Sequence, residues 1–500
     1  MVTIEELYQI YLQHPQIQTD TRLLQPGDIF FALKGPNFNG NAFAPRALEL
    51  GAAYAVIDEK PATGVDAHGS TAGDPRLLLV GDVLTTLQDL ALHHRKQFDI
   101  PFIAITGSNG KTTTKELVHA ALAAEYITYT TKGNLNNHIG VPLTLLSVRR
   151  DAEFAVIEMG ANHQKEIAGY CRYALPTHGI ITNIGRAHLE GFGGPEGVKK
   201  GKGELYDHLR DHNGTAFVLR DSEDLRQMSR GIPHVITYGT HDADYIGRVA
   251  PGNAAPGNAA PGNAGSKGDA GTFLNVEITH GATTGVLHTS LVGDYNLPNI
   301  LVAVAVAKHF GVPDARIRKA IEQYTPSNSR SQLLEKDGNH IILDAYNANP
   351  SSMRAAIENF AKLPVDAAAT TLTSGTSANA SRAGFDNKIL ILGAMAELGP
   401  ESVHEHQGII DLIGQYPWRE VVLVGGDFLK AKHNYKTFQN SKEAAQWFHN
   451  TGIRDAWLLI KGSRSSRMEE VLATPQDQPK TSPQDQPKSS PQDHPKTSQA

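Results

Sequence analysis

The stretch "FIAITGSNGKTTTKELVHAALAAE", residues 102–125, decides the fold of the middle of this chain. Its apolar, β-branched start over 102–106 predicts a buried strand, and a helix is predicted from about Lys111 onward. The glycine-bracketed turn between them can surround phosphate oxygens with backbone N–H groups, while a lysine reaches the terminal phosphates and a Ser or Thr hydroxyl holds Mg²⁺. The predicted phosphate loop consists of Gly107, Ser108, Asn109, Gly110, Lys111, Thr112 and Thr113.

This loop is a shortened form of the general pattern, because only Ser108 and Asn109 separate Gly107 from Gly110. The same residues also suit an ordinary strand–turn–helix with a surface lysine. The strand before the turn, the helix after it and the double threonine favour a nucleotide site.

Working outward, strands and helices alternate along the chain, which is typical of a parallel sheet covered by helices on both faces. We therefore predict an α/β protein with three domains. The predicted parts are a small mixed α/β N-terminal domain (1–98), a central P-loop parallel-sheet domain resembling an ATPase (99–325), a Rossmann-like α/β C-terminal domain (326–473) and a repetitive tail (474–500).

Three low-complexity segments interrupt the pattern, and we expect them to be flexible because they have too little apolar surface to offset the entropy of ordering. They are the APGNA repeat at 250–264, a polar stretch at 370–384 and an eight-residue repeat at 475–498.

The composition excludes several classes of function. The net charge of −6, from 46 basic and 52 acidic side chains, gives no indication of a nucleic-acid or membrane-surface partner. A single cysteine, Cys171, rules out an intramolecular disulfide and fits a cytosolic protein. The first residues lack the basic and apolar regions of a signal peptide, and no apolar run reaches the length of a membrane span.

Two metal-binding candidates follow other predicted strands of the central domain. Glu158 ends the run "AVIE", and His188 comes shortly after "ITNIG". A histidine after a strand is more often structural. However, open parallel sheets bind ligands at the carboxyl ends of their strands, where both residues and the phosphate loop are expected to meet. Phosphate charge needs a metal partner there.

The motifs, taken in order, resemble those of the Mur ligase family over roughly residues 20–470. The matching segments are "TGSNGKTTTKE", "GNLNNHIGVPLTLL", "EMGANHQKEI", "ITNIGRAHLEGFG", "KGKGELYDHL", "GDYNLPN", "NSRSQ", "LDAYNANPSSM" and "ILGAMAELG". Within the family the pattern is most similar to the member that joins D-alanyl-D-alanine to UDP-N-acetylmuramoyl-tripeptide, with "NNHIGVPLTLL" and "DAYNANP" as the most specific pieces.

The resemblance implies roles for individual residues. Lys111, Glu158, His188 and Lys202 would be catalytic. Thr112, Glu158, His188 and a carbamylated Lys202 would hold two Mg²⁺ ions, whereas a plain surface lysine is the other interpretation of Lys202. Asn299, Arg330 and Asp344 would join the phosphate loop in binding ATP. The acyl substrate and the dipeptide would contact Thr21, Arg22, Asn136, Asn137, Tyr346, Asn347 and Asn349.

The chain departs from the family pattern at Ala394, where an aspartate is common, and at Thr21, where serine is commoner. The resemblance implies a cytoplasmic, monomeric ligase that uses ATP and Mg²⁺ to make an amide through an acyl phosphate, giving the pentapeptide precursor of peptidoglycan. This fits a sequence without a candidate Ser/His/Asp triad or catalytic cysteine.

Other functions stay open on the sequence alone. A sister ligase that adds a single amino acid, or a folylpolyglutamate synthase-like enzyme, would share the scaffold. A non-catalytic nucleotide-binding scaffold would instead be expected to lack the metal ligands Glu158, His188 and Lys202, all of which are present.

Overall fold

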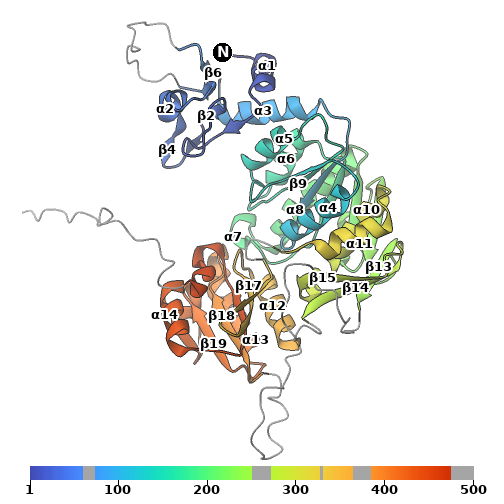
Figure 1. Cartoon of the computed structure of the whole chain (residues 1–500), viewed down its shortest axis with the longest axis vertical. Coiled ribbons are helices and arrows are strands. Elements are labelled where there is room, and N and C mark those ends of the chain that lie inside the picture. Colours follow the sequence, from blue (N-terminus) through green and yellow to red (C-terminus); the bar gives the residue numbers. More distant parts are fainter. Residues whose placement is uncertain (60–73, 251–271, 327–329, 364–384, 474–500) are drawn as a thin grey trace, which may run out of the picture.

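The computed structural model describes residues 1–59, 74–250, 272–326, 330–363 and 385–473. The segments predicted to be flexible at 250–264 (apart from Ala250), 370–384 and 475–498 lie outside the described residues. The described part contains three main sheets, which follow one another along the chain (Figure 1).

The first sheet is parallel and has the strand order β1-β2-β5-β6. Successive side chains of its strand β2 point to opposite faces of the sheet, as in any β-strand. Phe31 belongs to the same core cluster as Leu7 of α1 and Leu87 of α3, whereas Phe30 belongs to the cluster that contains Leu48 of α2. The elements are α1 (Ile4–Gln13), β1 (Ile17–Gln18), β2 (Ile29–Phe31), the small hairpin β3 (Lys34–Gly35) and β4 (Phe38–Asn39), α2 (Ala44–Glu49), β5 (Tyr54–Ile57), β6 (Leu77–Leu79) and α3 (Val83–Arg95).

Polar contacts fasten this part to the central one. Tyr11 Oη donates to the carbonyl of Leu146 at 2.5 Å, and His94 Nε2 lies 2.9 Å from the carbonyl of Val148. The Arg95 guanidinium donates to the last carbonyls of a central helix, at Ala174 and Leu175.

The central sheet has nine strands in the order β15-β14-β13-β12-β11-β10-β7-β9-β8. Strands β7 to β13 run parallel to one another, as predicted. Strands β14 and β15 form an antiparallel edge that the strand–helix alternation did not predict. The strands are β7 (Phe102–Thr106), β8 (Thr128–Thr130), β9 (Phe154–Glu158), β10 (His178–Ile181), β11 (Thr215–Leu219), β12 (His234–Gly239), β13 (Tyr245–Val249), β14 (Phe273–His280) and β15 (Val286–Val292).

Helices cover both faces of this sheet. Helices α4, α10 and α11 contact one another on one face. On the other face α5 and α6 pack with α3, and α8 packs with α6. Apolar residues fill α10 almost all round, since it is buried between the sheet and α4. The helices are α4 (Lys111–Ala123), α5 (Gly140–Ser147), α6 (Glu166–Ala174), α7 (Leu189–Phe192), α8 (Pro195–Asp211), α9 (Glu223–Met228), α10 (Leu297–His309) and α11 (Asp314–Gln323).

The third sheet has the order β16-β17-β21-β18-β19-β20, with only β16 antiparallel. Alternate residues of β18 again face different layers: Leu390 joins the cluster containing Phe360 of α12, and Ile391 joins the cluster containing Phe448 of α14. The elements are β16 (Gln332–Lys336), β17 (Asn339–Asp344), α12 (Pro350–Lys362), β18 (Lys388–Gly393), α13 (Ser402–Ile413), β19 (Glu420–Val424), β20 (Lys436–Phe438), α14 (Ser441–Thr451) and β21 (Trp457–Lys461).

The three parts follow the long axis of the molecule, and α7 lies where the central part meets the C-terminal one (Figure 1). A search of the described residues finds no helix with the length and hydropathy needed to cross a membrane.

Candidate functional site

A cleft of about 730 Å³ lies between the carboxyl ends of the central parallel strands and the C-terminal part. This is where an open parallel sheet binds its ligands. Most of the predicted site residues line it: Ser108, Asn109, Gly110, Lys111, Thr112, Thr113, Asn136, Asn137, Glu158, His188, Asn299, Arg330, Asp344, Tyr346 and Asn347.

The phosphate loop follows β7 and is held from behind by residues after β10. Gly107 has φ +140°, and a Cβ there would lie 2.0 Å from Thr182 Oγ1, so a glycine is required. Thr182 Oγ1 donates to the carbonyl of Asn109 at 2.6 Å, and the Asn109 N–H donates to Asn183 Oδ1 at 3.0 Å. Gly110 adopts a left-handed conformation with φ +78° immediately before α4. The loop is therefore fixed before α4 begins.

Lys111, the first residue of α4, lies over the loop. Its Nζ donates to the carbonyls of Gly107 at 2.7 Å and Ser108 at 3.2 Å. Burial lowers the pKa of Lys111 to about 8, an effect that the nearby Arg330 reinforces and Glu158 opposes. The site therefore favours an anionic ligand, since negative charge beside Lys111 would restore the ammonium form.

Glu158 ends β9 and is buried. One carboxylate oxygen, Oε1, accepts a hydrogen bond from Asn136 Nδ2 at 2.7 Å, but Oε2 is buried and has no hydrogen-bond partner among the described residues. A buried carboxylate oxygen without a partner is costly, and a cation would satisfy it. The residues therefore fit Mg²⁺ at Glu158 beside Thr112. The described residues hold no group of three or more His, Cys, Asp or Glu side chains that could hold a metal alone. Phosphate and water oxygens would have to complete the coordination.

Lys202, in the middle of α8, does not line the cleft. It is fully buried, its Nζ donates to the carbonyl of Ala161 at 2.9 Å, and it lies 4.9 Å from the centre of the Phe192 ring. The interpretation of Lys202 as a surface lysine is therefore wrong. Burial, with the charge of Lys111 nearby, lowers the pKa of Lys202 well below its ordinary value.

His188 precedes α7 and meets Glu397, which comes from the C-terminal part. His188 Nδ1 and Glu397 Oε2 form a hydrogen-bonded pair. The His188 imidazole lowers the pKa of the Glu397 carboxyl, although desolvation opposes this.

Arg330 and Asp344 lie on the C-terminal side of the cleft. The Arg330 guanidinium stacks 3.6 Å from the centre of the Tyr346 ring. Asp344 forms an ion pair with Lys461 Nζ at 2.5 Å, and Lys461 also donates to the carbonyl of Asn347 at 3.2 Å.

Two asparagines that line the cleft also make contacts that shape it. Asn299 accepts from Thr114 Oγ1 at 3.0 Å, which joins α10 to α4 beside the phosphate loop. Asn137 Oδ1 accepts the Gly140 N–H at 2.8 Å and so caps α5.

Besides the pair of His188 and Glu397, three further polar contacts between described residues join the C-terminal part to the loops of the central part. Asn349 Nδ2 donates to Asn109 Oδ1 at 2.7 Å, so Asn349 contacts the phosphate loop although it does not line the cleft. The Arg186 N–H donates to Ser351 Oγ at 3.0 Å, and the Arg186 guanidinium pairs with Glu405 at 2.5 Å.

Thr21 and Arg22 do not line the cleft. They lie between β1 and β2 of the N-terminal part, where the largely exposed Arg22 pairs with Asp20 at 2.6 Å. A role in substrate binding stays a prediction for both residues.

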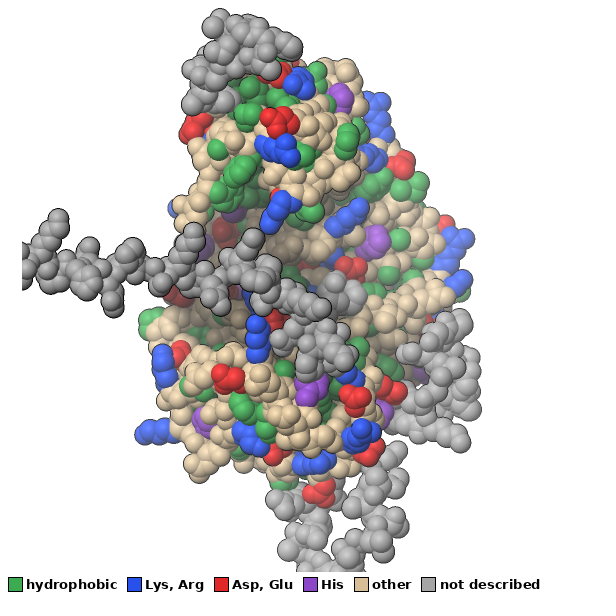
Figure 2. All heavy atoms as spheres, turned by 60° about the vertical axis from the view of Figure 1, so that its left-hand side comes forward, with side chains coloured by type: hydrophobic (Ala, Val, Ile, Leu, Met, Phe, Trp, Pro, Cys, Tyr) green, Lys and Arg blue, Asp and Glu red, His purple; other side chains and the backbone are tan. Residues whose placement is uncertain are grey.

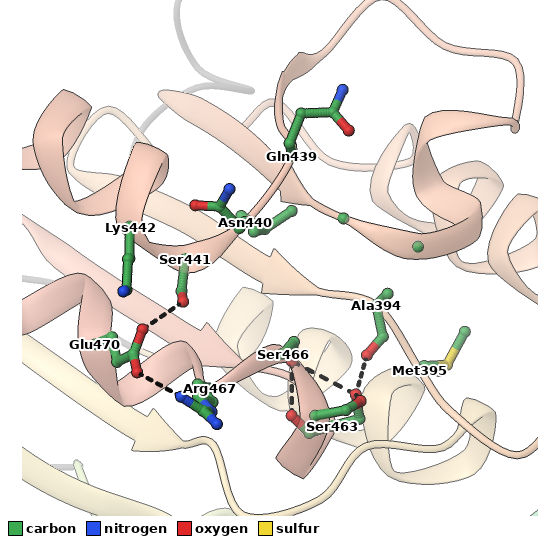
Figure 3. Close-up of a pocket in the computed structure, with 14 residues that line it drawn as sticks. Ala394, Met395, Gln439, Asn440, Ser441, Lys442, Ser463, Ser466, Arg467 and Glu470 are labelled. Carbon is green, nitrogen blue, oxygen red and sulfur yellow. Dashed lines mark hydrogen bonds and ion pairs between the residues drawn. The ribbon is translucent and has the colours of Figure 1, made fainter. Parts of the chain in front are cut away.

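A second cavity, of about 470 Å³, lies at the carboxyl ends of β18, β19, β20 and β21 (Figure 3). Ala394 lines this cavity, and a Cβ on Gly426 would lie 2.4 Å from its methyl group. The Ala394 carbonyl accepts from Ser463 Oγ at 2.6 Å, and Ser463 also lines the main cleft. The departure at Ala394 therefore lies in this second cavity, and the backbone of Ala394 contacts Ser463 of the main cleft.

The sequence interpretation missed several residues that line the cleft: Asn134, Asn162, Glu166, Asn183, Tyr295, Glu397, Lys461, Ser463, Arg464 and Ser465. A signal existed for some of them. The polar run "KGSRSS" begins at Lys461, the last residue of β21, and the same reasoning on strand ends that selected Glu158 would have selected it.

The surface carries no single-sign patch on the face seen in Figure 2, where Lys and Arg side chains are interspersed with Asp and Glu. This distribution agrees with the charge balance of the sequence.

Comparison with known proteins identifies the class. Residues 15–95 match the model described as Mur ligase family, catalytic domain, and residues 105–307 match the Mur ligase middle domain. The chain belongs to the Mur ligase family, and the predicted family and α/β fold class are confirmed.

The relatives give the particular kind of ligase. The UDP-N-acetylmuramoyl-tripeptide–D-alanyl-D-alanine ligase of Bacillus subtilis is 30% identical over 466 residues, covering 91% of this chain and 92% of that protein. The enzyme of the same name from Escherichia coli is 32% identical over 482 residues, covering 92% and 93%. The crystal structure of MurF from Acinetobacter baumannii superposes with a TM-score of 0.74 at 29% identity, covering 94% of this chain and 97% of that one.

Proposed function

We propose that this ligase joins D-alanyl-D-alanine to UDP-N-acetylmuramoyl-tripeptide at the expense of ATP, giving the pentapeptide precursor of peptidoglycan. The observation that carries the proposal is the cleft itself. The same cleft is lined by the phosphate loop, by Glu158 and by cationic side chains of the C-terminal part. Glu158 Oε2 has no hydrogen-bond partner among the described residues. The likeness to the Bacillus subtilis and Escherichia coli ligases supports the choice of substrates.

The chemistry needs positioning rather than a protein nucleophile. A carboxylate does not react with an amine to form an amide directly, because the leaving group would be an oxide ion. Transfer of the γ-phosphoryl group of ATP to the tripeptide carboxylate gives an acyl phosphate and ADP. The dipeptide amine then attacks the acyl carbon, loses a proton, and inorganic phosphate departs as the amide forms.

The chain's residues would hold these groups. Backbone N–H groups of the loop and the Lys111 ammonium would bind the phosphates, and Arg330 and Asp344 would hold the nucleotide from the C-terminal side. Asn136 would fix Glu158 through Oε1. Mg²⁺ held by Thr112, Glu158 and His188 would neutralise the charge of the phosphates when bound.

Carbamylation of Lys202 belongs to the same proposal. The depressed pKa makes the neutral amine accessible, and only the neutral amine reacts with CO₂ to form a carbamate and release a proton. A carbamate would supply an anionic oxygen ligand at a position where a protonated lysine would repel Mg²⁺.

Each part of the chain would have its own task. Residues 1–98 would bind the UDP sugar, 99–325 the ATP, and 326–473 would bring the dipeptide amine while excluding water from the acyl phosphate. Because ATP and UDP-linked precursors are cytoplasmic, we propose a cytoplasmic location.

Release of phosphate from ATP tests this proposal, with UDP-N-acetylmuramoyl-tripeptide and D-alanyl-D-alanine each omitted in turn. Release that needs both, with the mass of the pentapeptide product, supports it. A Lys111→Met variant should show neither. Release with a single amino acid in place of the dipeptide would indicate a sister ligase, and no release despite ATP binding would support a nucleotide-binding scaffold.

A further inference from the structure

His188 and Glu397 have an unusual backbone conformation in common. Both have positive φ, +54° at His188 and +61° at Glu397, which L residues other than glycine rarely adopt. Such residues persist only where the surrounding structure holds them, and they cluster at functional sites. Here two of them face each other across the junction of two parts of the chain.

The side chains form one contact across that junction. His188 Nδ1 pairs with Glu397 Oε2, and the His188 side chain is only 16% exposed whereas that of Glu397 is 52% exposed. The described residues offer no hydrogen bond to His188 Nε2, and His188 lines the cleft. The pair therefore occupies Nδ1 and leaves Nε2 available to a ligand in the cleft.

The backbone around Glu397 is seated on α7. Gly399 has φ +57°, and a Cβ there would lie 3.1 Å from Glu190 Cβ. The ion pair between Arg186 and Glu405 holds the same junction a few residues away. In the structure the C-terminal part is docked, and these contacts place Glu397 against His188.

We propose that Glu397 is a positioning residue that fixes the ring of His188 when the C-terminal part docks. The carboxylate accepts a hydrogen bond from Nδ1–H, which selects the tautomer with a free lone pair on Nε2 and orients that nitrogen toward the cleft. Carboxylate–histidine pairs of this kind make the imidazole a better ligand.

The inference rests on the proposed function and adds to it a coupling between docking of the C-terminal part and the geometry of His188. His188 becomes fully competent only after the part that carries the amine has docked. Phosphoryl transfer before docking is thereby disfavoured, which limits wasteful hydrolysis of ATP.

The test compares Glu397→Ala with Glu405→Gln as a matched control. Both variants remove a carboxylate of the C-terminal part at the same junction, but Glu405 pairs with Arg186 and not with His188. Two quantities are measured on the full chain: Mn²⁺ affinity with ADP present, by electron paramagnetic resonance, and kcat and KM of ligation.

For Glu397→Ala we expect Mn²⁺ affinity and kcat to fall by about 10–100-fold, with KM for ATP nearly unchanged. Glu397→Gln, which keeps an oxygen acceptor without the charge, should fall between Glu397→Ala and the wild type. Glu405→Gln should raise the KM of the substrates and leave Mn²⁺ affinity unchanged.

Wild-type Mn²⁺ affinity and kcat in Glu397→Ala, or a profile matching that of Glu405→Gln, would overturn the inference. If the wild type releases no phosphate, the proposed function fails, and the Mn²⁺ measurement still decides the role of Glu397. Thermal unfolding verifies that each variant is folded.

Discussion

The affinity for nucleotide should fall as pH rises from 7 to 9, because Lys111 loses its charge in this range. Burial lowers the pKa of Lys111 from 10.5 to about 8 in the free protein. Phosphate groups bind the ammonium form, so the observed affinity scales with the fraction of the protein that carries the proton, until the bound complex also titrates.

The magnitude follows from the titration curve. With a pKa of about 8, the protonated fraction falls from about 0.9 at pH 7 to about 0.1 at pH 9. The dissociation constant for an ATP analogue should therefore rise about tenfold over this range. The stability of the free chain changes with pH in the opposite direction to the nucleotide affinity. Between pH 8 and 10.5 the unfolded chain holds more protons on Lys111 than the folded one, so this group's contribution to stability rises with pH.

Isothermal titration calorimetry with a non-hydrolysable ATP analogue and Mg²⁺ measures the effect. Buffers of different ionisation enthalpy should report proton uptake on binding near pH 8.5. Lys111→Arg is the control, since a guanidinium stays protonated throughout and its dissociation constant should be flat with pH. Equal pH dependence in the wild type and in Lys111→Arg would refute the assignment to Lys111.

Three further substitutions test the phosphate loop and two buried lysines of the C-terminal part. Gly107→Ala should abolish nucleotide binding and leave circular dichroism unchanged, because its Cβ would lie 2.0 Å from Thr182 Oγ1; normal binding would contradict this. Lys461→Met should destabilise the chain by about 3 kcal/mol in urea unfolding, since it leaves Asp344, 17% exposed, without its partner; an unchanged midpoint would count against it. Lys388→Met should cost about 2 kcal/mol in the same assay, because the buried Nζ donates at 2.8 Å to two carbonyls, and a stabilised variant would show the reasoning wrong.

The sequence predicted the parts of the fold that local pattern controls. The strand over Phe102–Thr106, the glycine turn and the helix from Lys111 were all readable, because apolar runs and glycines determine them within a few residues. The antiparallel edge formed by β14 and β15 was not. Which strand pairs with which depends on contacts distant in sequence, and strand–helix alternation elsewhere gave no indication of a change in direction.

The candidate site divides in the same way. The place of Glu158 at the end of an apolar strand was predictable. The structure adds a buried Oε2 that has no hydrogen-bond partner among the described residues. Lys202 had two interpretations on sequence grounds, since polar neighbours surround it along the chain. Only the packing of Ala161 and Phe192 around it shows that it is buried.

Glu397 shows why some residues of such a site escape any reading of one sequence. Its partner His188 lies more than two hundred positions away on another part of the chain. Both residues have left-handed backbones, which cost roughly 1–2 kcal/mol each for side chains other than glycine. Glu190 of α7 lies against Gly399, so we expect the packing of α7 against this loop to help maintain both backbone conformations. Substitutions in these loops should therefore weaken docking and the His188 geometry before they weaken either domain's own fold.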